Sequence, residues 1–178
     1  MRFRILGPPE VWDGGRRAAV GGPQQRALLA VLLLNANRVV STSRLVDYLW
    51  GEPHPATVRG LLQGCVAQLR RALRIGEDQP LLTRAPGYLL RVRAGELDLD
   101  RFEELAAEAR RLMSDGTPAA LAPAVEVQGE ALALWRGPAL DGVTLDALTH
   151  RSTSDAGSTA QGSAIPGLHL RPLLWRSS

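Results

Sequence analysis

Short apolar and polar runs alternate over the first forty or so residues and predict small strands around one helix. Three strand-like runs, Arg2–Leu6, Glu10–Trp12 and Arg16–Val20, are separated by Gly-Pro-Pro and Asp-Gly-Gly turns. An apolar segment then runs from Pro23 to Leu34, and a proline at its start suits the first turn of a helix. Val39–Val40 can add one further short strand.

The most regular apolar pattern lies between residues 56 and 75. A shorter helix is expected before it, from Arg44 to Trp50, with N-cap candidates at Ser41–Ser43. In the longer segment, apolar residues recur at steps of three and one, which is the spacing of one helix face. They are Val58, Leu61, Leu62, Cys65, Val66, Leu69, Ala72 and Leu73.

Arginine and glutamine side chains occupy the opposite face of this long predicted helix. At about 100° per residue, Arg59, Gln63, Arg70 and Arg74 fall together, and Arg71 flanks them. Arginine binds guanine edges or phosphates, and glutamine can bind adenine, so the row suits a helix in the DNA major groove. The same row also suits a face that only meets water, and the helix alone leaves both interpretations open.

A predicted hairpin follows the long helix. Leu81–Arg84 and Gly87–Val92 are strand-like, and Pro86 and Gly87 suit positions i+1 and i+2 of a type II turn, with Arg84 at the tip. This order of helices and hairpin is that of a winged helix, in which the hairpin contacts the DNA backbone or minor groove. We therefore predict an α+β winged helix-turn-helix domain over residues 1–93.

Charge separates this domain from the next segment. Residues 1–93 have a net charge of +8, whereas residues 94–148 have a net charge of −7. A basic unit followed by an acidic one indicates a polyanion-binding part joined to a part with another role. All 21 basic residues are arginine, which excludes lysine chemistry such as a P-loop or a Schiff base.

The sequence offers no enzyme or metal site. His54, His150 and His169 are far apart, and Cys65 falls on the apolar stripe, so no metal-ligand spacing exists. No phosphate loop and no nucleophile motif occurs, and we predict no catalytic residue and no cofactor. The apolar run Ala27–Leu34 is too short to cross a bilayer, so no membrane partner is expected. A single cysteine fits the cytoplasm, where we expect the protein at the nucleoid.

Seven ordered segments resemble one known family. They are Gly22–Ala30, Asn37–Ser41, Arg44–Gly51, Leu69–Leu73, Thr83–Leu90, Leu97–Phe102 and Ala131–Leu140. Together they resemble the actinobacterial antibiotic regulatory proteins, the SARP family of pathway-specific activators of secondary-metabolite genes. The resemblance implies an OmpR-type winged helix followed by an all-helical bacterial transcriptional activation domain, and it covers residues 1–142.

The resemblance also implies partners. Family members bind direct repeats of double-stranded DNA near promoters, as side-by-side copies that form a homodimer on the DNA, and recruit RNA polymerase. It places the recognition helix at Ala56–Leu73, the wing at Leu81–Val92 and a polymerase-contacting loop at Trp50–Thr57. Thr57 starts the helix and is a candidate phosphate contact. The expected DNA-binding residues are Thr57, Arg59, Gln63, Arg70, Arg71, Arg74 and Arg84.

Two glycines depart from the family pattern. Gly60 and Gly64 stand in the recognition helix where relatives carry larger side chains, and each costs a helix interior about 1 kcal/mol relative to alanine. They indicate either a close approach to the groove floor or a weakened helix. We prefer the second interpretation, because no sequence rule requires glycine there.

The acidic segment predicts an incomplete all-α domain of tetratricopeptide-like helices at residues 94–148. Asp98 or Asp100 can cap a helix to Met113, and a second helix runs from Thr117 towards Trp135. Pro123 is expected to kink this second helix or delay its start. Only one helix pair is present where about three repeats are needed for stability.

Residues 149–178 are rich in small polar residues and are predicted to be a disordered tail of a truncated or frame-altered family member. The leading hypothesis is a sequence-specific DNA-binding transcription regulator. The alternative is a protein-interaction module that modulates a full-length relative through its acidic helical segment. Removal of residues 94–178 would separate the two, since DNA binding should survive it and partner binding should not.

Overall fold

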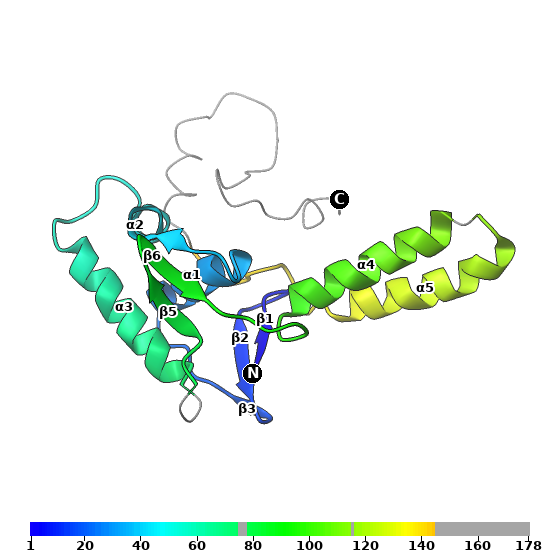
Figure 1. Cartoon of the computed structure of the whole chain (residues 1–178), viewed down its shortest axis with the longest axis horizontal. Helices are drawn as coiled ribbons and strands as arrows, with labels where there is room; N and C mark the ends of the chain where they lie inside the picture. Colours follow the sequence, from blue (N-terminus) through cyan, green and yellow to red (C-terminus); the bar gives the residue numbers. More distant parts are fainter. Residues whose placement is uncertain (75–77, 115, 145–178) are drawn as a thin grey trace.

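Two three-stranded antiparallel sheets flank the helices of the N-terminal part of the chain (Figure 1). The computed structural model describes residues 1–74, 78–114 and 116–144, so the predicted tail at 149–178 lies outside the described residues. The first sheet contains β1 (Arg2–Arg4), β2 (Glu10–Asp13) and β3 (Arg16–Arg17) in that order. The third strand is shorter than predicted: its two arginines form the ladder with β2, and Ala18 adds one further hydrogen bond, from its amide to the Val11 carbonyl at 2.9 Å.

Three helices form the centre of this part: α1 (Pro23–Leu34), α2 (Thr42–Trp50) and α3 (Val58–Ala72). Helix α1 has the predicted bounds, and residues 27–33 within it are all buried, which places it in the middle of the core. Helix α2 begins two residues earlier than predicted, because the Ser41 hydroxyl accepts a hydrogen bond from the Arg44 amide at 3.3 Å and so caps it.

The second sheet has the order β4-β6-β5, with β4 (Val40–Ser41), β5 (Leu81–Arg84) and β6 (Gly87–Leu90). The predicted type II turn is wrong. The Ala85–Pro86 peptide is cis, and Gly87 already pairs with Arg84 in the ladder, so the proline lies at position i+2, as in a type VI turn.

The apolar stripe of α3 is confirmed with one correction. Five of the predicted residues within the helix, and Leu73 at its C-cap, are buried, and Ala72 is half-buried. Leu61 is instead 46% exposed. At about 100° per residue it lies roughly 90° from the centre of the stripe, and α1 and α2 cover only the central part.

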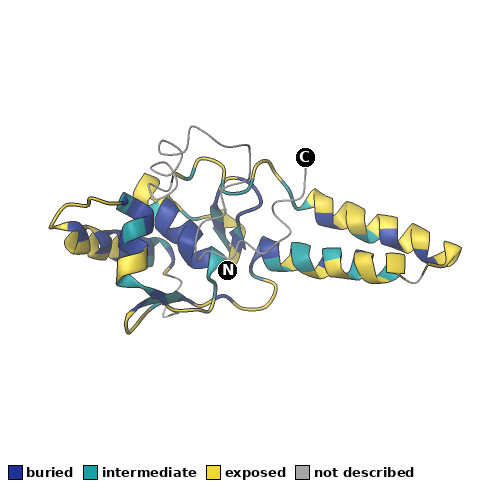
Figure 2. Ribbon diagram, turned by 90° about the horizontal axis from the view of Figure 1, so that it is seen from above, coloured by how far each residue is buried: buried dark blue, intermediate teal, exposed yellow. Residues whose placement is uncertain are grey.

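Helices α4 (Asp98–Ser114) and α5 (Pro118–Ala133) form an antiparallel pair that projects from the body as an arm, the α4–α5 arm (Figure 1). Most of the arm is exposed, whereas buried residues concentrate in the body (Figure 2). Small buried side chains, Ala120, Ala124 and Ala131, face α4. Pro123 lies inside α5 without delaying its start, so that part of the prediction is wrong.

Hydrogen bonds to the backbone of Ile5 and Leu6, the two residues after β1, join the arm to the body. The Ile5 and Leu6 amides donate to the Asp98 carboxylate at 2.8 and 3.1 Å. Their carbonyl groups accept from the backbone of the segment after α5, Leu6 from the Arg136 amide at 2.8 Å and Ile5 from the Leu140 amide at 3.0 Å. We call these five residues the junction. They link the two predicted domains on either side of residue 93 through hydrogen bonds.

Candidate nucleic-acid interface

The outer side of α3 lies at one edge of the molecule, beside the hairpin of β5 and β6 (Figure 1). The structure places Thr57, Arg59, Gln63, Arg71 and Arg74 on this side, all exposed, and we call them the α3 face. Arg84 is exposed at the end of β5, at the hairpin tip. Six of the seven predicted residues are therefore open to a ligand.

Packing on the inner side of α3 fixes the direction of this face. Buried Leu62, Val66 and Leu69 pack into the core, where α3 contacts both α1 and α2. At the helix margin the Gln25 amide of α1 donates to the Gln68 side-chain oxygen at 2.6 Å. The α3 face is thus presented by a rigid three-helix core, which is the arrangement that major-groove insertion needs.

Arg70, the seventh predicted residue, points elsewhere. Its side chain is half-buried, and its Nε donates to the Leu81 carbonyl at 3.1 Å while its Nη2 donates to the Thr83 hydroxyl at 2.7 Å. Its guanidinium also lies 6.0 Å from the centroid of the Tyr88 ring. Helix periodicity grouped Arg70 with Arg59, but it cannot show that the hairpin covers this flank of α3.

The hairpin partners of Arg70 are residues that sequence reasoning missed. Thr83 and Tyr88 stand opposite each other in the β5–β6 register, so their side chains share one face of the hairpin. The only sequence signal for them is their place in a predicted hairpin, one pair away from the Arg84–Gly87 pair at its tip. Nothing in the helix pattern indicates that an arginine of α3 would reach them.

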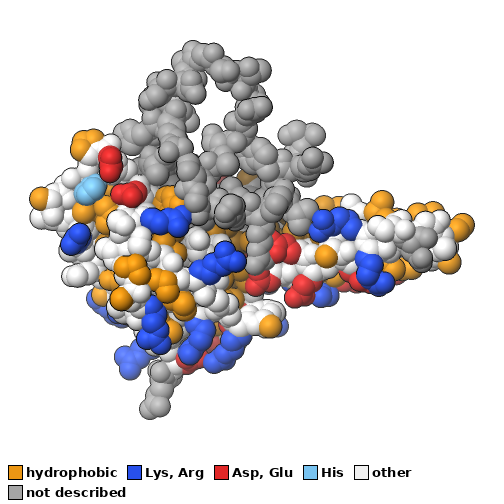
Figure 3. Space-filling view, turned by 45° about the horizontal axis from the view of Figure 1, so that its top comes forward, with side chains coloured by type: hydrophobic (Ala, Val, Ile, Leu, Met, Phe, Trp, Pro, Cys, Tyr) orange, Lys and Arg blue, Asp and Glu red, His pale blue; other side chains and the backbone are white. Residues whose placement is uncertain are grey.

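Unpaired positive charge gathers at this interface. Within the described parts of the chain, no carboxylate pairs with Arg59, Arg71, Arg74 or Arg84. Three other arginines of the body are paired, Arg17 with Glu10 at 3.4 Å, and Arg91 and Arg93 with Asp78. Figure 3 shows acidic side chains near the base of the arm and also on the body, next to a histidine side chain. The interface therefore offers a cationic surface to a polyanion.

Gly60 and Gly64 lie in the middle of the exposed side of α3. An added Cβ at either position would meet nothing within 4 Å, so no contact within the described structure explains them. Both interpretations of these glycines stay open. A helix surface without side chains suits close approach to a groove, and two glycines also weaken a helix.

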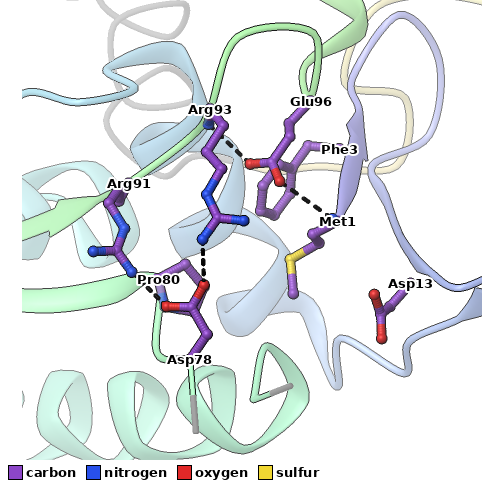
Figure 4. Close-up of a pocket in the computed structure, with 8 residues that line it drawn as sticks. All are labelled: Met1, Phe3, Asp13, Asp78, Pro80, Arg91, Arg93 and Glu96. Atoms are coloured by element: carbon purple, nitrogen blue, oxygen red, sulfur yellow. Dashed lines mark hydrogen bonds and ion pairs between the residues drawn. The ribbon is translucent and has the colours of Figure 1, made fainter. Parts of the chain in front are cut away.

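A cavity of about 250 Å³ lies between the N-terminal sheet and the end of β6 (Figure 4). Its charges neutralise one another. Asp78 pairs with both Arg91 and Arg93, and Glu96 binds the N-terminal amine at 3.2 Å. The cavity thus offers no concentrated charge to a ligand. Within the described residues no three metal-ligand side chains cluster, and no described helix has the length and apolarity to span a membrane.

Comparisons with known proteins agree with this architecture. Residues 17–90 match the family model "Transcriptional regulatory protein, C terminal", and residues 97–159 match "Bacterial transcriptional activator domain". The chain is also 40% identical over 144 residues to the regulatory protein AfsR of Streptomyces coelicolor. The chain belongs to the SARP family. The second match continues past residue 142, where the family's sequence motifs end.

Other relatives of this SARP chain extend the comparison. It is 34% identical over 145 residues to the transcriptional regulator RedD of Streptomyces coelicolor. A solved structure of Mycobacterium tuberculosis EmbR, in complex with a low-affinity phosphopeptide, superposes with a TM-score of 0.70 at 33% identity, over 79% of this chain and 37% of that one. The predicted winged helix followed by a helical unit is confirmed.

The chain is much shorter than the relatives that it matches. The AfsR match covers 80% of this chain but 14% of AfsR, and the RedD match covers 79% of this chain and 40% of RedD. The shared region thus contains the winged helix and the start of the activation domain, and the remaining parts of these relatives have no counterpart in it.

Proposed function

We propose that this SARP chain is a sequence-specific DNA-binding transcription regulator, a pathway-specific activator of secondary-metabolite genes or a weakened form of one. The observation that carries the proposal is the α3 face, whose arginines have no carboxylate partner in the described chain and stand beside an exposed Arg84 on the wing. Two copies bind adjacent direct repeats of double-stranded DNA near a promoter. The protein acts in the cytoplasm, at the nucleoid.

Each residue of the interface has a role that its position supports. Thr57 is the N-cap residue of α3, and its side chain makes no capping hydrogen bond, so its hydroxyl and the helix N-terminus can bind a phosphate. Arg59 and Gln63 lie in the first half of α3 and serve base edges and flanking phosphates. Arg71 and Arg74 serve backbone phosphates, and Arg84 contacts the backbone or minor groove.

The proposal is tested by selecting bound sequences from a random duplex pool with purified protein at two salt concentrations. We expect a direct repeat whose halves are spaced by about one helical turn. With about four to six phosphates neutralised, log K against log salt should have a slope of about −4 to −5. Unrelated sequences that are all lost at the higher salt would contradict sequence-specific binding, and a slope near zero would contradict DNA binding altogether.

A matched pair of substitutions assigns the binding to the α3 face. Arg71→Gln should reduce the magnitude of the salt slope by about 0.9, the contribution of one phosphate. Arg110→Gln removes the same charge from the exposed surface of α4, on the arm, and should leave the slope unchanged. Equal effects of both variants would mean that only the net charge matters.

The arm supports a second role, contact with RNA polymerase or another protein. Helix α5 exposes Leu121, Val125 and Leu132, by 57%, 71% and 59%, and these residues share one side of the helix. The loop at residues 50–57 is a further candidate for polymerase contact. If the arm recruits polymerase, replacing the three apolar residues by Gln, Thr and Gln should abolish activated transcription in vitro while DNA affinity stays unchanged.

The same triple variant addresses the alternative function, a protein-interaction module that modulates a full-length relative. A chain that acts only in this way would bind a SARP relative in pull-down experiments, lose that binding in the triple variant and select no operator. Unaltered transcription by the triple variant on a selected operator would contradict a role for this side of α5.

A further inference from the structure

The hairpin is held on its open side by one side chain of α3. Strand β5 is the edge of its sheet, because β6 lies between it and β4. At this edge the Arg70 guanidinium binds the Leu81 carbonyl and the Thr83 hydroxyl, at 3.1 and 2.7 Å. Arg70 thus takes the place that a neighbouring strand would have next to β5.

A second link reinforces this contact. The Gln79 side-chain amide donates to the Arg70 carbonyl at 3.5 Å, and its side-chain oxygen accepts from the Leu81 amide at 3.4 Å. Both backbone polar groups of Leu81 are therefore tied to α3, one through the Arg70 side chain and one through Gln79. The start of β5 cannot move away from α3 without breaking these bonds.

The position of Thr83 connects the contact to the tip of the hairpin. Thr83 directly precedes Arg84 and stands opposite Tyr88, whose ring lies under the Arg70 guanidinium with a centroid distance of 6.0 Å. Arg70 therefore contacts both strands of the hairpin close to Arg84, the exposed residue at its tip. A charged donor makes such hydrogen bonds stronger than neutral ones.

We propose that Arg70 is a positioning residue that clamps the hairpin against α3 and so sets the distance between the α3 face and Arg84 on the DNA. The inference rests on the proposed function, since it concerns how two parts of one DNA surface are held in register. In this role Arg70 binds no DNA, in contrast to its neighbour Arg71, which is exposed and has no carboxylate partner among the described residues.

Two substitutions that preserve every charge distinguish a role of Arg70 as a clamp on the hairpin from a direct contact with DNA. Arg70→Lys retains the positive charge but not the guanidinium that donates to two acceptors at once. Thr83→Val removes the hydroxyl while leaving Arg70 intact. If Arg70 clamps the hairpin, each should weaken binding to the selected operator by about threefold to tenfold. The double variant should be no weaker than the worse single variant by more than about twofold, because both changes break one contact.

The salt slope gives an independent readout. Both charge-conserving variants should keep the wild-type slope. Arg110→Lys, the matched control on the exposed surface of α4, lies outside the interface and should keep wild-type affinity as well. Wild-type affinity for Arg70→Lys together with wild-type or tighter binding for Thr83→Val would overturn the proposal, because a direct phosphate contact predicts that pattern.

Hydrogen exchange without DNA keeps the clamp testable if the proposed function fails. Amides of β5 and β6 should exchange about tenfold faster in Thr83→Val and Arg70→Lys than in Arg110→Lys. Unchanged exchange in both variants would overturn the clamp even if the protein binds its operator. Faster exchange in a protein that selects no DNA would instead retain the clamp and reject the function.

Discussion

At the scale of single residues, Gly87 has no room for a side chain. A Cβ at this position would overlap the Val40 carbonyl oxygen and come within 2.8 Å of the Ser41 Cα, both backbone atoms of β4. Backbone atoms cannot rotate away as the end of a flexible side chain can. The close pairing of β4 with β6 therefore requires glycine for its size.

Gly87→Ala should lower the free energy of unfolding by about 2–4 kcal/mol, because the sheet must separate to admit the methyl group. Urea denaturation followed by circular dichroism measures this. Gly60→Ala is the matched control, since the same methyl group there meets open space. A loss below about 0.5 kcal/mol for Gly87→Ala would show that β4 moves aside without cost.

Gly60 and Gly64 lead to the opposite prediction. Alanine at each exposed helix position should raise the free energy of unfolding by up to about 1 kcal/mol. DNA affinity then separates the two interpretations of these glycines. A stabler protein with unchanged or tighter binding supports a helix weakened by glycine, whereas a stabler protein that loses operator affinity supports close approach of the backbone to the groove.

At the scale of elements, α3 shows what apolar spacing predicts and what it omits. The stripe of buried residues follows from periodicity alone, and so do the bounds of α1, since its apolar run and first-turn proline are local features. The exposure of Leu61 and the position of Arg70 depend on which neighbours cover each flank of α3. Those neighbours come from other parts of the chain, so local spacing cannot reveal them.

Adjacent leucines test this account of α3. Leu62 is 1% exposed, and Leu62→Ala should cost about 2–5 kcal/mol of unfolding free energy. Leu61 is 46% exposed, and Leu61→Ala should change stability by no more than about 0.5 kcal/mol. Both can be measured by thermal or urea unfolding. Similar losses at the two positions would place Leu61 in the core, as the original stripe predicted.

The turn of the hairpin shows another limit of local sequence. Pro86 followed by Gly87 suits a type II turn, but the structure has a cis peptide before Pro86 and uses Gly87 inside the ladder. The close passage of β4 decides the role of this glycine. A dipeptide signal thus predicted the place of the hairpin correctly and its geometry wrongly.

At the scale of the whole molecule, Arg136 connects the arm to the first sheet. Its guanidinium lies 3.2 Å from a Glu10 carboxylate oxygen and 3.8 Å from one of Asp98, and it donates to the Pro8 carbonyl at 3.2 Å. Its side chain is 25% exposed, and those of Glu10 and Asp98 are 14% and 9% exposed. The cluster is therefore largely shielded from water.

Arg136→Gln should lower the free energy of unfolding by about 2 kcal/mol, because two shielded carboxylates lose their shared cation. Arg111→Gln is the matched control, since Arg111 pairs with Glu108 on the open surface of α4 with 70% of its side chain exposed. That change should stay within about 0.5 kcal/mol. Equal losses of stability in the two variants would mean that shielding from water does not strengthen the ion pairs of Arg136.

Acid should weaken the body through Glu10. Burial favours a raised pKa for Glu10, but the Trp12 hydrogen bond and the charges of Arg136 and Arg17 outweigh it and hold the pKa below its ordinary value of 4.5. A carboxyl with a lowered pKa adds stability that is fully present above the unfolded value and is lost as pH falls through the folded value. For Asp98 burial prevails and raises the pKa, so its protonation favours the folded state.

Glu10→Gln should therefore be less stable than the wild type at neutral pH and should lose less stability as the pH falls below 4.5. Urea unfolding at a series of pH values measures the two curves, which should converge in acid. Parallel curves for Glu10→Gln would contradict the assignment.

The junction also has a consequence for the order of events during synthesis. Ile5 and Leu6 leave the ribosome well before Asp98, Arg136 and Leu140, which supply the hydrogen-bond partners of their amides and carbonyls. Until those residues emerge, the two amides and two carbonyls of Ile5 and Leu6 must form hydrogen bonds with water. The segment just after β1, although translated long before these partners, is thus among the last parts of the described chain to acquire its native hydrogen bonds.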